Sequence, residues 1–138
     1  ILIKTLKKYN CKTALLSGGF SFFAKQIGKD LGFEYIISNE LELNNNCLTG
    51  ELVGPIIDSN AKKNTLKKLA QINKIDLIDT MAVGDGSNDI EMIKLAGLGI
   101  GYFAKPELKK NSDININNGD LTSLLYAQGY KKSQFIFN

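Results

Sequence analysis

The sequence predicts an α/β fold, with a Rossmann-like, mostly parallel sheet, flanking helices and a small β-hairpin. Short apolar segments with strand character alternate with longer segments whose apolar residues recur at helical spacing. Strands separated by helices of this length pair in parallel, because each crossover helix returns the chain to the same end of the sheet. An Asn-rich turn over 44–46 joins two strand-like segments and predicts the hairpin. The 138 residues fit one domain, 1–138.

The first half of the chain alternates helical and strand patterns. Apolar residues at helical spacing indicate the helices, and Gly32 follows the second one as a stop signal. A Ser-Gly-Gly segment follows the first apolar strand and is expected to form a tight loop. The expected elements are a helix over 1–9, a short buried strand over 12–16, a loop over 17–19, a helix over 20–31, a strand over 35–37 and hairpin strands over 40–43 and 48–53.

The second half repeats the alternation of strand, loop and helix. Pro55 and the polar segment 58–60 break the chain before a helix, and Gly97 is expected to close a later one. The expected elements are a helix over 61–71, a strand over 80–83, a polar loop over 84–89, a helix over 89–97, a strand over 98–102, a helical turn from 105–106, a strand over 113–116 and a helix over 121–127. The basic tail from Gly129 receives no functional assignment.

Composition excludes several classes of function. The net charge of +3 comes from 17 Lys and Arg against 14 Asp and Glu, and the lysines fall in scattered pairs, so no nucleic-acid partner is implied. The chain has no His, and Cys11 and Cys47 lack CxxC spacing, which argues against zinc sites and Ser-His or Cys-His catalysis. We expect buried or incidental thiols in a reducing cytoplasm. No apolar run approaches the roughly 18 residues of a membrane span, so no membrane partner is expected.

Polar segments follow the predicted strands where a parallel sheet gathers its ligands. After the strand ending at Leu16, Gly18 lets backbone N–H groups approach an anion closely, and Ser17 adds a hydroxyl. The alternative is that this segment is an ordinary tight turn. Asp85, directly after a later strand, can hold a hard cation such as Mg²⁺ together with water and phosphate oxygens.

Each remaining candidate also has a structural interpretation. Lys62 can place a positive charge on a phosphate, although it and its neighbour Lys63 can also be solvated residues on an exposed helix turn. Asp-Gly at position 85 is a hairpin signal, but helical periodicity follows it. Asn88 or Asp89 can be only the N-cap of the next helix. Capping is compatible with a role in the site.

Three segments together resemble the haloacid-dehalogenase superfamily of phosphotransferases. "ALLSGGF" (14–20) looks like its second motif, Lys62 like its third and "VGDGSND" (83–89) like its fourth. The order and flanks agree through "NELEL", "LTGELVGPIID", "NAKKNTL" and the long segment from "DTMAVGDGSND" to "GYFAKPEL". The likeness runs from about residue 2 to 125 and is strongest to members that hydrolyse O-phosphoserine for serine biosynthesis. It implies the fold core of that superfamily.

The resemblance implies a Mg²⁺-dependent mechanism. An aspartate attacks a phosphomonoester, and water hydrolyses the resulting aspartyl-phosphate. Positioning and charge neutralisation supply most of the catalysis. By position, Ser17 would hydrogen-bond the phosphate beside the Gly18 N–H, and Lys62 would neutralise developing charge.

The fourth motif supplies the remaining implied roles. Asp85 would ligate Mg²⁺, and Asn88 would contact the phosphate or substrate. Asp89 would organise the surroundings of the metal and orient Lys62. Lys62 is preferred over Lys63 because it follows Asn60-Ala61 at the spacing of the superfamily.

The sequence departs from the superfamily at the nucleophile. The expected DxDxT motif is absent, and the nearest text, Asp76 to Thr80, has the wrong spacing and precedes a strand. We therefore expect the first strand, its aspartate and the cap to lie upstream of Ile1 or on a separate chain, and the isolated 138 residues to be inactive. The alternatives are another small-molecule phosphatase of the superfamily, or a truncated non-catalytic phosphate-binding or metal-binding domain. The sequence indicates no oligomeric state.

Overall fold

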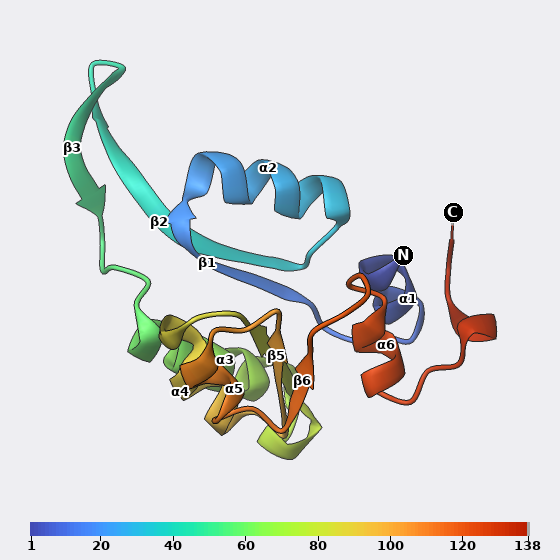
Figure 1. Cartoon of the computed structure of the whole chain (residues 1–138). Helices are drawn as coiled ribbons and strands as arrows, with labels where there is room; N and C mark the ends of the chain where they lie inside the picture. The colour runs from blue at the N-terminus through green and yellow to red at the C-terminus, as the bar shows by residue number, and fades with distance from the viewer. Residues whose placement is uncertain (138) are drawn as a thin grey trace. The chain divides into compact units, whose positions relative to one another are not determined.

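The chain divides into two compact units in a computed structural model that describes residues 1–137. Of the predicted domain 1–138, Asn138 lies outside the described residues. One unit comprises Ile1–Ile57 and the C-terminal residues from Ser133, and the other comprises Asp58–Lys132. Each unit has a three-stranded sheet with helices beside it, so the predicted α/β class is confirmed (Figure 1). Within residues 1–137 the strands form two sheets, β1-β2-β3 and β4-β5-β6, where the sequence predicted one.

The first unit is built around a parallel strand pair and a hairpin. Strand β1 pairs in parallel with β2, and β2 pairs in antiparallel with β3. Helix α2 lies along β1 and β2, while the β2–β3 hairpin extends beyond it (Figure 1). The elements are α1 (Leu2–Lys8), β1 (Ala14–Phe20), α2 (Ser21–Leu31), β2 (Tyr35–Asn44) and β3 (Cys47–Val53).

Strand β1 differs from its prediction in extent and in burial. The Ser17-Gly18-Gly19 segment, expected to be a loop, continues the strand, with a register shift between Ser17 and Phe20. The expected buried strand is also wrong, since Ala14 is exposed and the two leucines after it are only half-buried. Among the described residues β1 pairs on one side only, because it is the edge strand of its sheet.

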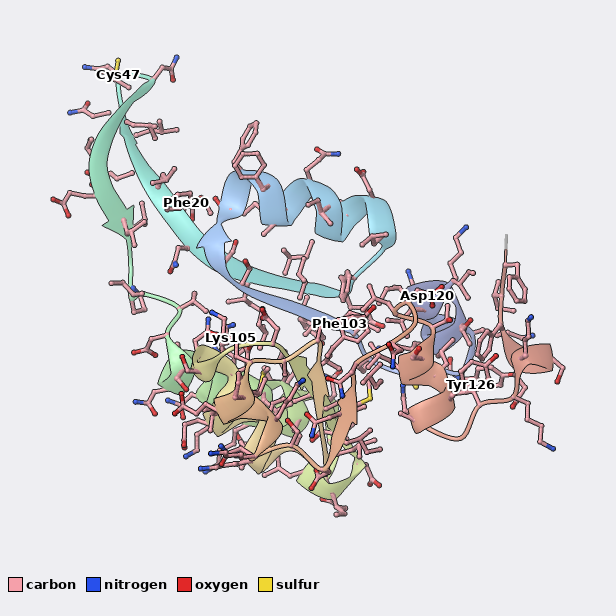
Figure 2. The ribbon with its side chains drawn as sticks, viewed as in Figure 1. Phe20, Cys47, Phe103, Lys105, Asp120 and Tyr126 are labelled. Carbon is pink, nitrogen blue, oxygen red and sulfur yellow. The ribbon has the colours of Figure 1, made fainter. Side chains whose placement is uncertain are left out.

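The β2–β3 hairpin turns at the predicted asparagines. Asn45 and Asn46 have φ values of 48° and 62°, the left-handed conformation that two-residue hairpin turns require and that asparagine tolerates. The segments 35–37 and 40–43, predicted as separate strands, form the single strand β2. Cys47, at the tip of the hairpin in Figure 2, is exposed and Cys11 is half-buried. Neither thiol is buried, so the interpretation of the two cysteines as buried thiols is wrong and the interpretation as incidental thiols remains.

From Ser133 onward, the C-terminal tail belongs to the first unit. Thr5 in α1 is fully buried, and its Oγ1 accepts a hydrogen bond from the Ile136 N–H at 2.9 Å. Phe135 is only 7% exposed. The tail, for which the sequence suggested no role, therefore completes the surroundings of α1.

The second unit carries three parallel strands whose carboxyl ends meet at one edge of the sheet. Ile93, Ile100 and Leu108 are buried in its core. None of the helices in the described part of the chain is long and apolar enough to cross a membrane. The elements are α3 (Ser59–Asn73), η1 (Leu77–Asp79), β4 (Met81–Gly84), η2 (Ser87–Asp89), α4 (Ile90–Leu95), β5 (Leu98–Tyr102), α5 (Pro106–Lys109), β6 (Ile114–Ile116), α6 (Ser123–Ala127) and η3 (Lys132–Gln134), the last of which runs into the first unit.

Gly97 does not close α4 in the expected way. The helix ends at Leu95 with Ala96 as its C-cap, and Gly97 is absent from the glycines with positive φ. A Cβ atom on Gly97 would collide with the backbone carbonyl of Ile78. The glycine is needed for close approach of two backbone segments and not for a left-handed cap.

Candidate phosphate and metal site

The loop between β4 and α4 is organised by one buried carboxylate. Asp89 is 5% exposed, and its Oδ2 accepts hydrogen bonds from the N–H groups of Asp85 and Gly86 at 3.1 and 3.3 Å. These are main-chain donors that the turn would otherwise leave unpaired. Asp89 occupies the N-cap position of α4, but its side chain makes no capping hydrogen bond to that helix and instead bonds the loop before it, so the interpretation of Asp89 as only an N-cap is wrong.

Gly84, the last residue of β4, leaves the space that Asp89 occupies. A Cβ atom built on Gly84 would lie 2.6 Å from Oδ2 of Asp89 and closer still to its Cβ. Any side chain at this position would displace the carboxylate from the two N–H groups whose hydrogen bonds it accepts. The glycine before Asp85 is therefore part of the geometry of the loop.

Lys62 reaches the same carboxylate from α3. That helix begins at Asp58, whose side chain accepts the Ala61 N–H at 2.8 Å, so Lys62 lies in its first turn. Nζ of Lys62 donates to Oδ1 of Asp89 at 2.6 Å, and each side chain is 6% exposed. Both carboxylate oxygens of Asp89 thus have partners, which is what a buried charge needs to be tolerated.

The neighbouring Lys63 lies in a different environment. Its Nζ is 3.0 Å from Oε2 of Glu91 on α4, and the two side chains are 40% and 39% exposed. The hydrogen bond from Lys63 and its positive charge hold the pKa of Glu91 below the ordinary value. The solvated-face interpretation therefore describes Lys63 and does not describe Lys62.

Asp85 and Asn88 remain exposed above this buried pair. In the described residues the Asp85 carboxylate has no hydrogen-bond or ion-pair partner, while its main-chain carbonyl accepts the Lys105 N–H at 2.8 Å. Residues 1–137 contain no group of three or more His, Cys, Asp or Glu that could hold a metal by itself. Mg²⁺ commonly uses one or two carboxylates and completes its shell with water and phosphate oxygens. The free carboxylate of Asp85 fits one ligand of such an ion.

Ser17 and Gly18 lie in the first unit, where the side chain of Asn39 is hydrogen-bonded to the main chain of their strand. Oγ of Ser17 accepts the Gly19 N–H at 3.0 Å. Nδ2 of Asn39 donates to the Gly18 carbonyl at 2.8 Å, and its Oδ1 accepts the Ile57 N–H at 2.7 Å. Asn39 is 7% exposed. Its amide group thus fixes the Gly18 peptide.

The structure brings together part of the predicted set. Lys62, Asp85 and Asp89 are linked by hydrogen bonds at the carboxyl end of β4, with Asn88 in the same loop. That Ser17 and Gly18 share a site with them stays a prediction. Asn39 was not identified from the sequence as a site residue. A polar residue inside the apolar alternation of a strand is the signal that could have indicated it.

The fold and the loop geometry are those of a known family. Residues 2–94 match the family model described as haloacid dehalogenase-like hydrolase, which is two thirds of the chain, and the chain belongs to this family.

Relatives that match the chain include phosphoserine phosphatases. The chain is 45% identical over 123 residues to the phosphoserine phosphatase of Methanocaldococcus jannaschii, covering 89% of this chain and 58% of that protein. It is 39% identical over 138 residues to the enzyme of the same name from Saccharomyces cerevisiae, covering 99% of this chain and 44% of that protein. A solved structure described as a substrate-bound phosphoserine phosphatase complex superimposes with a TM-score of 0.86 at 44% identity, covering 91% of this chain and 60% of that one. The chain therefore spans about half the length of the curated relatives it matches.

Proposed function

We propose that this chain is the phosphate-binding and metal-binding part of a phosphoserine phosphatase that hydrolyses O-phosphoserine to serine and phosphate in serine biosynthesis. The observation that carries the proposal is the buried Lys62–Asp89 pair beneath the unpartnered carboxylate of Asp85. The proposal is supported by family membership and by relatives of that name at 39% and 45% identity. Two free cysteines suit a reducing cytoplasm, where we place the activity.

The chemistry assigned to Lys62 follows from its remaining donors. An ammonium group has three N–H donors, and the described contacts use one of them, on Asp89. The other two can meet phosphate oxygens as negative charge develops on them in the transition state. Asp89 keeps the ammonium group in place through their buried ion pair, in which Nζ of Lys62 lies 2.6 Å from Oδ1 of Asp89.

The metal ligand assigned to this chain is Asp85. A bound Mg²⁺ ion would neutralise phosphate charge and orient the phosphoryl group for in-line attack. Asp89 contributes by fixing the backbone N–H groups on both sides of the Asp85 side chain. Ser17, Gly18 and Asn88 are proposed to hydrogen-bond the phosphate or the substrate.

The nucleophile is proposed to come from outside these 138 residues. Covalent phosphatase chemistry of this kind needs an aspartate that takes the phosphoryl group and then loses it to water. The sequence has no DxDxT motif. We therefore assign the aspartyl-phosphate to a segment not contained in residues 1–138 and expect the isolated chain to release no phosphate.

The test is phosphate release from O-phosphoserine with Mg²⁺, measured for the full-length protein and for the 138-residue chain. We expect turnover by the full-length protein only, and its loss when EDTA removes the metal. p-Nitrophenyl phosphate and O-phosphothreonine serve as comparison substrates. Preference for another phosphomonoester would replace the substrate assignment, and Mg²⁺-independent turnover would overturn the assignment of Asp85.

A further inference from the structure

The residues after β5 adopt a costly backbone conformation beside the candidate metal site. Phe103 has φ = 46°, in the left-handed region, and it follows Tyr102 at the carboxyl end of the strand. For a bulky residue this is an outlier, and such residues persist only where their surroundings enforce them. Phe103 is itself 55% exposed. Packing of its own ring in a core therefore does not explain the conformation.

The residues around Phe103 hold the turn at several points. The Phe103 N–H donates to the Ile116 carbonyl at 2.8 Å, which extends the pairing of β5 with β6. Ala104 is 5% exposed. Lys105 then precedes α5, whose Leu108 is fully buried. Figure 2 labels Phe103 and Lys105, the two ends of this turn.

The last residue of the turn, Lys105, is hydrogen-bonded to Asp85, the residue assigned as the metal ligand. The Lys105 N–H donates to the Asp85 carbonyl at 2.8 Å, whereas the Asp85 N–H donates to Asp89 at 3.1 Å. Both main-chain hydrogen-bonding groups of Asp85 are therefore held, one by the buried carboxylate and one by the turn. The side chain between them is the one group of Asp85 that is left for a ligand.

We propose that the turn Phe103–Lys105 is a positioning element for Asp85, acting through the main-chain N–H of Lys105. The inference rests on the proposed function, because it takes Asp85 as the Mg²⁺ ligand. A single carboxylate gives a metal site its geometry only if the backbone of that residue does not rotate. The hydrogen bond to the Asp85 carbonyl therefore contributes to metal affinity. The left-handed backbone conformation at Phe103 directs the Lys105 N–H toward the Asp85 carbonyl.

Two substitutions at one position separate the amide from the side chain. Lys105 has φ = −65°, the angle that proline adopts, so Lys105→Pro removes the N–H donor at a compatible backbone conformation. Lys105→Ala removes the same side chain and keeps the donor. Mn²⁺ binding to each full-length variant is measured by electron paramagnetic resonance of the free ion. We expect Lys105→Ala to bind within 2-fold of the unsubstituted protein and Lys105→Pro to bind about 10-fold more weakly.

The outcomes distinguish this inference from the proposed function. Unchanged Mn²⁺ affinity in Lys105→Pro would overturn the inference alone, as would an equal loss in Lys105→Ala, which would assign the effect to the ammonium group. Absence of Mn²⁺ binding by the unsubstituted full-length protein would overturn the metal assignment of the proposed function, and the inference with it.

Hydrogen exchange in the unsubstituted protein gives an answer even if Lys105→Pro does not fold. If the Lys105 amide and the metal support one another, the metal must slow exchange at that amide, because coupling between two sites is reciprocal. The Phe103 amide belongs to the same turn but donates to Ile116. We expect Mg²⁺ to protect Lys105 at least several-fold more than Phe103. Equal protection of the two amides would indicate general stabilisation and overturn the proposal.

Discussion

Nζ of Lys62 lies 2.6 Å from Oδ1 of Asp89, and this buried contact joins the first turn of α3 to the loop after β4. The other oxygen of Asp89 holds two main-chain N–H groups of that loop. One carboxylate therefore fixes both a lysine and the backbone that presents Asp85. The loss of this carboxylate charge is expected to affect the fold as well as the chemistry.

Asp89→Asn is predicted to destabilise the protein by about 3 kcal/mol, because it leaves the buried ammonium group of Lys62 without a countercharge. The amide has nearly the same shape, but its NH₂ group cannot accept a hydrogen bond, so either Lys62 or the two main-chain N–H groups also lose their acceptor. Urea unfolding followed by circular dichroism measures the free energy of unfolding. Glu91→Gln is the matched control, since it removes the charge partner of the exposed Lys63 and should cost much less than Asp89→Asn. Equal losses in the two variants would contradict the importance assigned to burial.

Gly84→Ala is predicted to disturb the loop through one methyl group. The added Cβ would meet the Asp89 carboxylate, whose displacement breaks its hydrogen bonds to Asp85 and Gly86. We expect a loss of about 1–3 kcal/mol in unfolding free energy, as for other overpacked sites, together with weaker Mn²⁺ binding by the full-length protein.

The control for this variant is Gly86→Ala in the same loop. There the added Cβ would meet only Oδ1 of Asn88, at 3.2 Å, and Asn88 is an exposed side chain that can move. We expect a smaller effect on both measurements. A Gly84→Ala protein as stable as Gly86→Ala would show that Asp89 has room to shift.

The part of the site that could be predicted from the sequence is the part encoded by local pattern. The loop 84–89 after an apolar strand and the start of a helix just before Lys62 are set by neighbouring residues, and both were found close to their predicted positions. The choice of Lys62 over Lys63 came from spacing. Lys62 has a buried ion-pair partner in Asp89, and its role at a phosphate stays a prediction.

The features that were missed depend on contacts distant in the sequence. Asn39 is buried because it bonds the Gly18 and Ile57 backbones, 21 and 18 residues away. The close approach of Gly97 to Ile78 likewise follows from packing between segments. Strand β1 looked buried from its apolar composition, but burial of a strand depends on which elements cover the two faces of its sheet, and composition does not encode this.

Glu91 is predicted to titrate below its ordinary pKa of 4.5, first because Lys63 donates a hydrogen bond to it and second because of the charge of Lys63. A depressed folded-state pKa means that the pair stabilises the folded protein above the unfolded-state pKa, and that this contribution is lost as the pH falls through the folded value. Lys63→Met should return the pKa of Glu91 toward 4.5. Side-chain NMR titration measures this directly.

Lys94→Met is the comparison for the Glu91 titration. Lys94 also lowers the pKa of Glu91, but its effect is smaller than that of Lys63. We therefore expect a smaller rise in this variant.

The stability difference between Lys63→Met and the unsubstituted protein should also shrink on acidification below the folded-state pKa of Glu91. A difference that stays constant through this pH range would exclude the ion pair as its source.

Asn39→Asp is predicted to separate the two hydrogen bonds that Asn39 makes. The carboxylate can still accept the Ile57 N–H, but it has no donor for the Gly18 carbonyl and places a negative oxygen against it. Because Asn39 is buried, we expect a loss of about 1–3 kcal/mol in unfolding free energy. Asn44→Asp, at an exposed position of the same strand, should change it by no more than about 0.5 kcal/mol. If Gly18 binds phosphate as proposed, Asn39→Asp should also raise the KM of the full-length enzyme for O-phosphoserine, whereas Asn44→Asp should not. A stable Asn39→Asp protein with unchanged KM would show that the Gly18 peptide keeps its position without the amide donor.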